Sequence, residues 1–178
     1  MVYEKGCYYH LFNRGCNKEL IFRDNRDYQK LQKIIRESKL SEYLHMCAFS
    51  FMPNHYHFLV RQISEKPVTN WIRYIFNIYV KYFNKKYERK GTLFESKVKA
   101  RYIDKLNYLV LITHYIHNNP KNEFNNKYSS MSFLRENTII YMPFYKEFFD
   151  TIDNYLNQFN EYKNMKDNDE MVEKYLFD

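Results

Sequence analysis

The sequence has few of the features that mark membrane, secreted or cysteine-rich proteins. Its longest apolar runs are a few residues, far below the roughly 20 residues that a membrane-spanning helix needs. The first 18 residues also lack the apolar core of a signal peptide. Three cysteines, Cys7, Cys16 and Cys47, without CxxC spacing, argue against a disulfide framework or a cysteine zinc site. We therefore expect no membrane segment and a reducing compartment, the cytoplasm.

The chain is instead rich in basic and aromatic residues. Its 178 residues include 28 Lys and Arg against 21 Asp and Glu, and 20% are aromatic, with 19 tyrosines. A chain of this length is expected to form one compact domain. The formal charge of +7 with many aromatic side chains favours nucleic acid, an acidic partner with stackable bases. A basic surface over an aromatic core has the same composition, so composition alone does not distinguish a nucleic-acid-binding protein from an ordinary basic one.

The charge is divided unevenly along the chain. Residues 138–178 contain four basic and nine acidic residues, whereas residues 1–137 contain 24 basic and 12 acidic ones. This division predicts a basic domain over 1–137 and an acidic helical extension over 138–178, helical from about Pro143 and fraying at its end. Nucleic-acid contacts are therefore expected in the first part.

Hydrophobic periodicity predicts strands and helices that alternate along the chain. The expected strands are residues 8–14, 43–51, 55–61 and 96–103. The expected helices are residues 27–39, 68–87 and a segment that ends near 118, with Asp104 as its N-cap. The turn signal Met52-Pro53-Asn54 predicts an antiparallel hairpin. Together these elements predict an α+β fold with an antiparallel sheet, helices mainly on one face and the other face free for a ligand.

Two histidines occupy alternate positions in the segment MPNHYHFLVR. Residues i and i+2 of a strand share a face, so His55, His57 and Arg61 are expected on one side. Tyr56 and Phe58 then belong to the opposite, core side. Imidazoles bind divalent metals, and a neighbouring arginine favours phosphate. Paired histidines on an exposed strand are more often simple surface residues, so the pair alone is a weak predictor of a metal site.

The helix that ends in YIHNNP combines a phenol and an amide on one face. Its predicted core stripe consists of Leu106, Leu109, Val110, Thr113 and Ile116. Tyr115 falls half a turn from that stripe, and Asn119 follows Tyr115 by one turn. Spacing alone does not choose Tyr115 over Tyr108 as a nucleophile, and a tyrosine here can also be a packing residue. His114 and His117 share a face and are rival metal ligands.

The segment from Arg73 to Lys105 is strongly basic. It contains ten basic and three acidic residues, interleaved with aromatic ones. Alternation along the expected strand places Lys97, Lys99 and Arg101 on one sheet face, where they can follow a phosphate backbone.

These motifs, taken in order, resemble the single-tyrosine HUH transposases, and in particular the REP-associated tyrosine transposases. The resemblance covers roughly residues 8–135. It is carried by the segments YYHLFNRGCNKELIFRDNRDY (8–28), AFSFMPNHYHFLV (48–60), YFNKKYERKGTLFESKVKA (82–100), YIHNNP (115–120) and KYSSMSF (127–133). It implies a ferredoxin-like α+β domain around a central antiparallel sheet.

The resemblance also implies a role for four residues. His55 and His57 match the HUH metal ligands, Asn119 matches the polar residue that completes the site, and Tyr115 matches the nucleophile. A Mg²⁺ or Mn²⁺ ion would polarise the scissile phosphate while the tyrosine forms a covalent phosphotyrosine and releases a 3′-OH. The phosphodiester energy is retained, so no ATP site is needed, and the sequence has no GxxxxGK[ST] motif.

The partner implied by the resemblance is single-stranded DNA, often with a hairpin. The candidate DNA contacts are Arg14, Arg61, Lys85, Lys86, Arg89, Lys97, Lys99 and Arg101. The sequence does not distinguish a monomer from a homodimer, or Tyr115 acting in cis from Tyr115 acting in trans. Two other functions fit the same residues: a non-catalytic module that binds single-stranded nucleic acid, and a metal-dependent nuclease in which water attacks.

Overall fold

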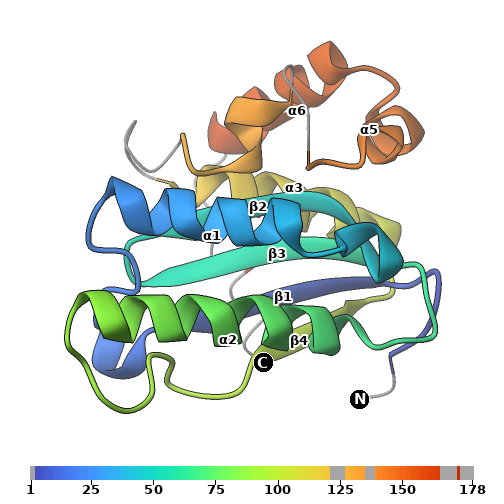
Figure 1. Ribbon diagram of the computed structural model, residues 1–178. Coiled ribbons are helices and arrows are strands. Elements are labelled where there is room, and N and C mark those ends of the chain that lie inside the picture. The colour runs from blue at the N-terminus through green and yellow to red at the C-terminus, as the bar shows by residue number, and fades with distance from the viewer. Residues whose placement is uncertain (1–2, 121–126, 135–138, 165–171, 173–178) are drawn as a thin grey trace.

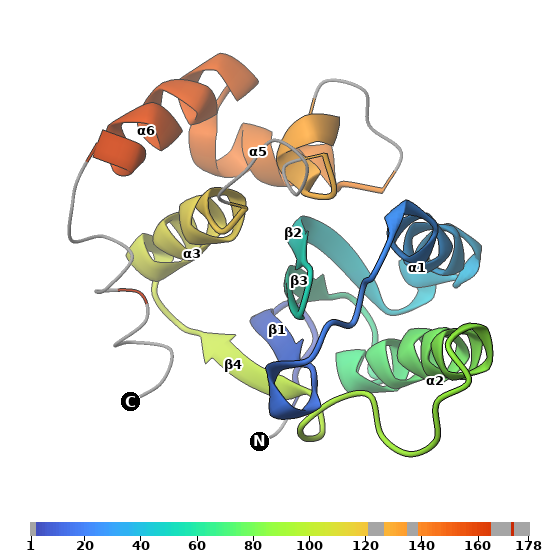
Figure 2. The same cartoon turned by 90° about the vertical axis from the view of Figure 1, so that its left-hand side faces the viewer.

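The computed structural model describes residues 3–120, 127–134, 139–164 and 172 and has an α+β architecture (Figures 1 and 2). The strands are β1 (Tyr8–Arg14), β2 (Leu44–Met52), β3 (His55–Gln62) and β4 (Lys99–Ile103). The α-helices are α1 (Asn25–Glu37), α2 (Val68–Lys86), α3 (Leu106–Asn118), α5 (Met142–Phe149) and α6 (Ile152–Asn164). Short 3-10 turns are η1 (Cys16–Lys18), η2 (Leu40–Glu42) and η3 (Ser130–Phe133).

The four strands form one sheet in the order β2-β3-β1-β4, and every neighbouring pair is antiparallel. The predicted hairpin is confirmed: β2 and β3 are joined through Pro53 and Asn54. The register of β1 and β3 places Phe12 opposite His57 and His10 opposite Leu59. Consecutive residues of a strand face opposite sides of the sheet, so His10, Phe12 and His57 share one face.

Helices α1 and α2 pack side by side on one face of the sheet (Figure 2). Tyr56 stacks on Phe76 of α2 with ring centroids 4.3 Å apart, and the Phe58 ring meets Trp71 of α2 edge-on. Helix α1 begins where Asp24 accepts hydrogen bonds from the first-turn amides, a capping box completed by the Asp27 side chain. This face forms the aromatic core that the sequence predicted.

Helix α3 lies on the opposite face of the sheet, against β2, β3 and β4 (Figure 2). We expected this face to be free, but α3 covers part of it. The reason lies in the sequence of the helix, whose second half is apolar or aromatic on almost every side and therefore needs packing partners all round. What remains open is a cleft at the end of the sheet where β3 begins.

Helix α6 packs against α3, and α5 packs against α6 and the edge strand β2 (Figure 1). The Tyr145 hydroxyl of α5 donates to the Cys47 carbonyl over 2.9 Å, and the Tyr141 amide donates to the Met46 carbonyl over 2.8 Å. Tyr155 of α6 is fully buried. The acidic extension thus contains helices, as predicted, and shares the core with the sheet. The fraying end predicted after α6 lies outside the described residues.

Several predicted boundaries differ from the structure by one or two residues, and β4 and α3 differ in further ways. Strand β4 begins at Lys99 and not at residue 96, because residues 95–97 form bends. Helix α3 is preceded by Lys105 as its N-cap, without a side-chain cap, so Asp104 does not have the capping role that we expected. Across the described parts of the chain, no helix has both the length and the apolar character needed to cross a bilayer.

Candidate active site

The turn between β2 and β3 fixes the start of the site. The Pro53 carbonyl accepts hydrogen bonds from the amides of Ile21 and Phe22, and the Asn54 carbonyl accepts one from the Gly15 amide. These contacts tie the hairpin turn to the loop that follows β1. His55 is the first residue of β3, so its backbone is held by this turn on one side and by the sheet on the other.

The half-buried His55 ring lies between two side-chain amides. Its Nδ1 is 2.7 Å from Oδ1 of Asn54, and its Nε2 is 3.1 Å from Oδ1 of Asn119. The Asn54 amide nitrogen donates to the Lys18 carbonyl, so its oxygen is the atom that faces the ring. His55 Nδ1–H is therefore the donor to Asn54, and Nε2 presents its lone pair toward the Asn119 oxygen. Burial lowers the pKa of His55, which favours the neutral ring.

His57 is more deeply placed, with 4% of its surface exposed. Its ring lies perpendicular to that of His55, with centroids 5.3 Å apart. Its Nδ1 is 2.8 Å from Nε2 of His10 on β1. Burial, together with the neighbouring His10 and His55, holds the pKa of His57 well below its usual range, and burial lowers that of His10 to about 3. The ring is thus neutral and able to bind a metal through Nε2.

Tyr115 comes to these histidines from α3, within the same chain. Its ring is only 5% exposed and meets the His57 ring edge-on, with centroids 5.6 Å apart. The backbone N–H of Asn119 donates to the backbone carbonyl of Tyr115. This helical hydrogen bond sets the two side chains one turn apart. One helix end therefore brings both the phenol and the amide to the histidine pair.

The predicted core stripe of α3 is only partly correct. Leu106 is 58% exposed and Val110 is half-buried. The buried residues of α3 are Leu109, Ile112, Thr113, His114, Tyr115, Ile116 and His117. Tyr115 is buried and not on an open side, because α3 has the sheet on one side and α6 on the other.

The rival ligands His114 and His117 point away from the cleft. The His114 ring stacks on Tyr155 of α6 at 5.2 Å. The two ring nitrogens of His117 are hydrogen-bonded to the hydroxyls of Tyr155 and Ser130. Both histidines therefore belong to the packing of α3 against α6 and η3.

A cavity of about 500 Å³ opens at this point, lined by Phe12, Asn13, Arg14, Asn54, His55, His57, Glu95, Lys99 and Tyr115. Two of the predicted DNA contacts line it. Arg14 Nε lies 3.2 Å from one Glu95 oxygen, and Lys99 Nζ lies 3.3 Å from the other. Partial burial alone would raise the pKa of Glu95, but the hydrogen bonds from Lys99 and Arg14 outweigh it and lower that pKa.

The other predicted DNA contacts lie elsewhere. Arg61 shares the face of His55 but is six residues further along β3, roughly 20 Å away, where it donates to the Gly6 carbonyl. Lys97 lines a separate cavity on the α2 side, whereas Lys99 lines the cleft. The prediction that these two lysines share a face is therefore wrong. Arg101 lies further along β4, opposite His10 of β1.

Three predicted contacts lie at the end of α2, on the other side of the sheet. Lys86 forms ion pairs with Asp24 and Asp27 at 2.8 and 2.7 Å, and Arg89 forms one with Glu19 at 3.1 Å. Lys85 is exposed on α2. Lys86 and Arg89 thus hold α2 to the segment before and within α1.

The sequence interpretation missed three site residues: His10, Asn54 and Glu95. Alternation along β1 does place His10 and Arg14 on one face, but the register that brings His10 to His57 depends on pairing between distant strands. Asn54 was counted only as a turn residue, and Glu95 only as one of three acidic residues in a basic stretch.

The donor set fits a divalent cation. Across the described part of the chain, no three His, Cys, Asp or Glu residues form a metal-binding group, so a third protein donor beside the two histidines would have to be another group, such as the Asn119 amide. Two neutral imidazoles line one cleft, and the 3.1 Å between His55 Nε2 and the Asn119 oxygen matches the spacing of about 3 Å between adjacent ligands of an octahedral ion. Because the Nδ1 proton of His55 is donated to Asn54, its Nε2 lone pair is available to a cation beside the Asn119 oxygen.

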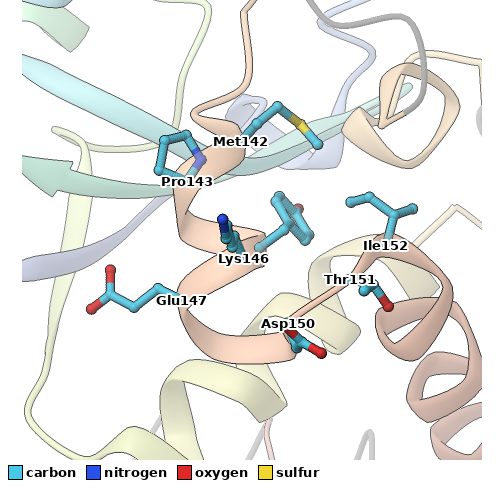
Figure 3. A pocket seen from close by; sticks show the side chains of 8 residues that line it. Met142, Pro143, Lys146, Glu147, Asp150, Thr151 and Ile152 are labelled. Atoms are coloured by element: carbon cyan, nitrogen blue, oxygen red, sulfur yellow. The ribbon is translucent and has the colours of Figure 1, made fainter.

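A second wide cavity, of about 560 Å³, lies between α5 and the start of α6 (Figure 3). Met142, Glu147 and Ile152 are among the residues that line it (Figure 3). It contains no histidine and none of the residues of the first cavity. The two histidines and Tyr115 line the first cavity and not this one.

Fold and site together define the class: a four-stranded antiparallel sheet whose histidine pair faces a helical tyrosine is the HUH transposase fold. The sequence model of the family "Transposase IS200 like" matches residues 3–119, more than half of the chain. The chain therefore belongs to the IS200-like transposase family. This membership supports transposase function.

Two solved structures resemble the chain in fold. A REP-associated tyrosine transposase bound to a REP hairpin has a TM-score of 0.51 and 16% identity, over 67% of this chain and 70% of that one. A candidate transposase from Deinococcus radiodurans has a TM-score of 0.46 and 16% identity, over 66% of this chain and 94% of that one. No curated protein sequence matches the chain.

Proposed function

We propose that the chain cleaves and rejoins single-stranded DNA through a covalent bond between Tyr115 and the scissile phosphate. The observation that carries this proposal is the contact of the Tyr115 ring with His57, 5.6 Å between centroids, in the same cleft where Asn119 meets His55 at 3.1 Å. A nucleophile and a metal-ligand set on adjacent elements are what phosphoryl transfer needs. Membership of a transposase family supports the same conclusion.

His55, His57 and Asn119 are the residues that would hold a Mg²⁺ or Mn²⁺ ion. Bound there, the ion would polarise a phosphate oxygen and stabilise the negative charge that develops on it. Asn54 Oδ1 contacts Nδ1 of His55, and His10 Nε2 contacts Nδ1 of His57. Three protein donors leave other coordination positions for the substrate.

The chain's own residues account for the bond changes. The phenolic oxygen of Tyr115 forms a bond to phosphorus while the bond from phosphorus to the 3′ oxygen breaks. The phenol loses its proton, and the departing oxygen gains one to become a 3′-OH. The reverse reaction joins a 3′-OH to the phosphotyrosine, so no nucleotide cofactor is required. Arg14 and Lys99 at the rim of the cleft would position the DNA backbone on either side of the bond.

The proposed substrate is single-stranded DNA with a hairpin. A solved transposase of similar fold is bound to a REP hairpin, which supports a DNA partner of this kind. Because His55, His57, Tyr115 and Asn119 meet within one chain, a monomer would suffice for cleavage in cis. A homodimer remains compatible with the same chemistry.

The test is to trap the intermediate. Wild-type protein is incubated with Mn²⁺ and hairpin-bearing single strands, and the products are resolved on a denaturing gel. We expect a protein–DNA adduct that Tyr115→Phe reduces by at least about 10³-fold. Tyr108→Phe is the matched control, because it removes a phenol from the same helix outside the cleft lining.

Each alternative function has its own outcome. An adduct that persists in Tyr115→Phe would assign the nucleophile elsewhere. Cleavage without an adduct, lost in His55→Ala and retained in Tyr115→Phe, would indicate a nuclease in which water attacks. Salt-dependent binding with neither cleavage nor a metal requirement would indicate a non-catalytic binding module.

A further inference from the structure

A second buried histidine supports the histidine pair from behind. His10 of β1 has none of its surface exposed, and its Nε2 lies 2.8 Å from Nδ1 of His57. The register of β1 and β3 makes the two residues diagonal neighbours on one face, within reach of each other's side chains. Neither the motif HYH nor the YIHNNP segment includes His10.

The geometry of this contact is that of a hydrogen bond and not of ring stacking. The two imidazole planes are nearly parallel, at 9°, with centroids 5.0 Å apart. The 2.8 Å between the nitrogens, together with the two ring radii, accounts for nearly all of that separation, so the rings lie edge to edge. An N–H bond lies in the plane of its ring, and this arrangement directs it at the partner nitrogen. Phe12, at 4.7 Å, packs on the face of His10 and holds its ring in place.

The position of the proton in this bond decides whether His57 can bind a cation. One proton lies between the two nitrogens, so one ring donates and the other accepts. If His57 coordinates through Nε2, its own proton must be on Nδ1, and Nε2 of His10 must then accept it. In the opposite arrangement, Nε2 of His57 carries a proton and has no lone pair for a metal.

The geometry points to His10 as a positioning residue of the cation site. His10 accepts the Nδ1 proton of His57 and directs the Nε2 lone pair of His57 into the cleft. This inference rests on the proposed function, because it assumes that His57 is a cation ligand. Hydrogen-bond partners behind metal-binding histidines fix the ring and its proton in this way, usually through a carboxylate or a carbonyl. Here an imidazole has that place.

The far side of His10 shows what this arrangement costs. Its Nδ1 is buried and has no hydrogen-bond partner among the residues that the structure describes. When His10 accepts at Nε2, its own proton lies on this Nδ1 without an acceptor, so the bond between the cation and His57 has to offset that cost. The corresponding partner of His55 is the Asn54 amide, whose direction is set by the Lys18 carbonyl.

The experiment measures cation binding in the full chain without DNA, so it does not depend on turnover. Mn²⁺ affinity is measured by calorimetry for wild type, His10→Phe and His10→Gln. His10→Phe keeps a flat ring but removes the acceptor, and we expect it to bind Mn²⁺ roughly 10- to 100-fold more weakly. His10→Gln supplies a carbonyl acceptor, and we expect it to recover most of the affinity.

A spectroscopic readout separates positioning from general damage to the fold. In ¹⁵N spectra of the wild type with Mg²⁺, His57 should be protonated at Nδ1, with coupling across the bond to His10. His10→Phe should lose that single tautomer, and His10→Gln should retain it. His114→Phe is the matched control, because it replaces another buried histidine with an unpaired Nδ1, on the α6 side of α3, and should bind Mn²⁺ like the wild type.

The possible outcomes separate this inference from the proposed function. If the wild type binds Mn²⁺ and His10→Phe binds it equally well with His57 in the same tautomer, the positioning role is wrong and the cation site stands. If His10→Phe does not fold, the tautomer of His57 in His10→Gln decides: a proton fixed on Nδ1 supports the positioning role, and a proton on Nε2 or a mixture of tautomers overturns it. If the wild type binds no cation at all, the proposed metal centre fails and the role of His10 fails with it.

Discussion

On the face of the sheet covered by α1 and α2, buried charge is enclosed on every side, whereas on the α3 face the buried polar atoms converge on an open cavity. Asp27 of α1 has none of its surface exposed. Its carboxylate accepts hydrogen bonds from the amides of Arg23 and Asp24, the hydroxyls of Tyr82 and Tyr87, and Nζ of Lys86. On the other face, His55 and His57 line the cleft, and the Asn119 oxygen lies 3.1 Å from His55 Nε2.

The difference shows how one strand serves stability and chemistry at once. Along β3, His57 faces the cleft and Phe58 faces the aromatic core, although the two are adjacent in sequence. A polar group enclosed by partners fixes the packing of two helices, and it has no capacity left for a ligand. A polar group with an unused lone pair contributes less to stability and is available for binding.

The largest expected effect comes from substituting the adjacent residues His57 and Phe58 one at a time. Phe58→Ala should lower the free energy of unfolding by about 3–5 kcal/mol, because it empties a fully buried site, while the folded protein still binds Mn²⁺. His57→Ala should abolish Mn²⁺ binding at a smaller cost in stability. Denaturant unfolding and Mn²⁺ calorimetry on both variants check this. Equal loss of Mn²⁺ binding in folded Phe58→Ala would show that the two faces are not independent.

A second comparison concerns two lysines that the sequence treated alike. Lys86→Gln should cost about 2–4 kcal/mol of stability, because it leaves the buried Asp27 without its cation, and the salt dependence of DNA binding should not change. Lys99→Gln should change stability by less than about 1 kcal/mol, because its ion pair is exposed, and it should reduce the slope of log K against log salt by about one. If Lys86→Gln also reduces that slope, Lys86 contacts DNA as the sequence predicted.

Helix α3 repeats the contrast within two adjacent residues, since Tyr115 faces the sheet and His114 faces α6. Burial lowers the pKa of His114 to about 4 from the usual 6.5. Between these values the unfolded chain binds a proton that the folded chain does not, so the free energy of unfolding falls as the pH falls. His114→Phe removes this contribution. Between pH 7 and pH 4.5 it should lose about 2 kcal/mol less stability than the wild type.

Urea titrations at the two pH values measure that difference. His10 and His117, whose pKa values burial lowers to about 3, keep both proteins acid-sensitive, so the comparison depends on the difference between slopes. Adduct formation at pH 7 should be the same in both proteins. Equal acid sensitivity of both proteins would mean that His114 is not held neutral in the fold.

Local features of the site were predictable from the sequence. Alternation in HYH placed His55 and His57 on one face, and the spacing of four placed Asn119 one turn after Tyr115. The same periodicities gave most of the strands and helices, because each depends only on neighbouring residues. The resemblance to a family then selected Tyr115 from 19 tyrosines, which spacing alone did not do.

What the sequence could not supply depends on contacts between distant segments. The acceptor behind His57 comes from β1 and is fixed by strand register. Whether a lysine faces DNA or a carboxylate is equally long-range: Lys86 meets Asp27 only because α1 and α2 pack together. The exposure of Leu106 and the burial of Tyr115 likewise depend on how α3 packs against the sheet and α6. Charge counting treats all such residues as equivalent.

The smallest expected effect concerns Glu95, whose carboxylate gives the cleft a negative charge that repels DNA phosphates. Glu95 holds Arg14 and Lys99 together at the rim, where a DNA phosphate would have to displace its carboxylate. Glu95→Gln should therefore tighten binding of a single-stranded oligonucleotide roughly 2- to 5-fold, since each exposed ion pair is worth up to about 1 kcal/mol. It should also steepen the salt dependence, because both cations become available to phosphates. Fluorescence anisotropy at several salt concentrations measures both, with the exposed Glu65→Gln as a control for net charge. Weaker binding by Glu95→Gln would instead mean that the carboxylate holds the two cations in the arrangement that DNA needs, so the rim of the α3 face would be as preorganised by ion pairs as the Asp27 site is.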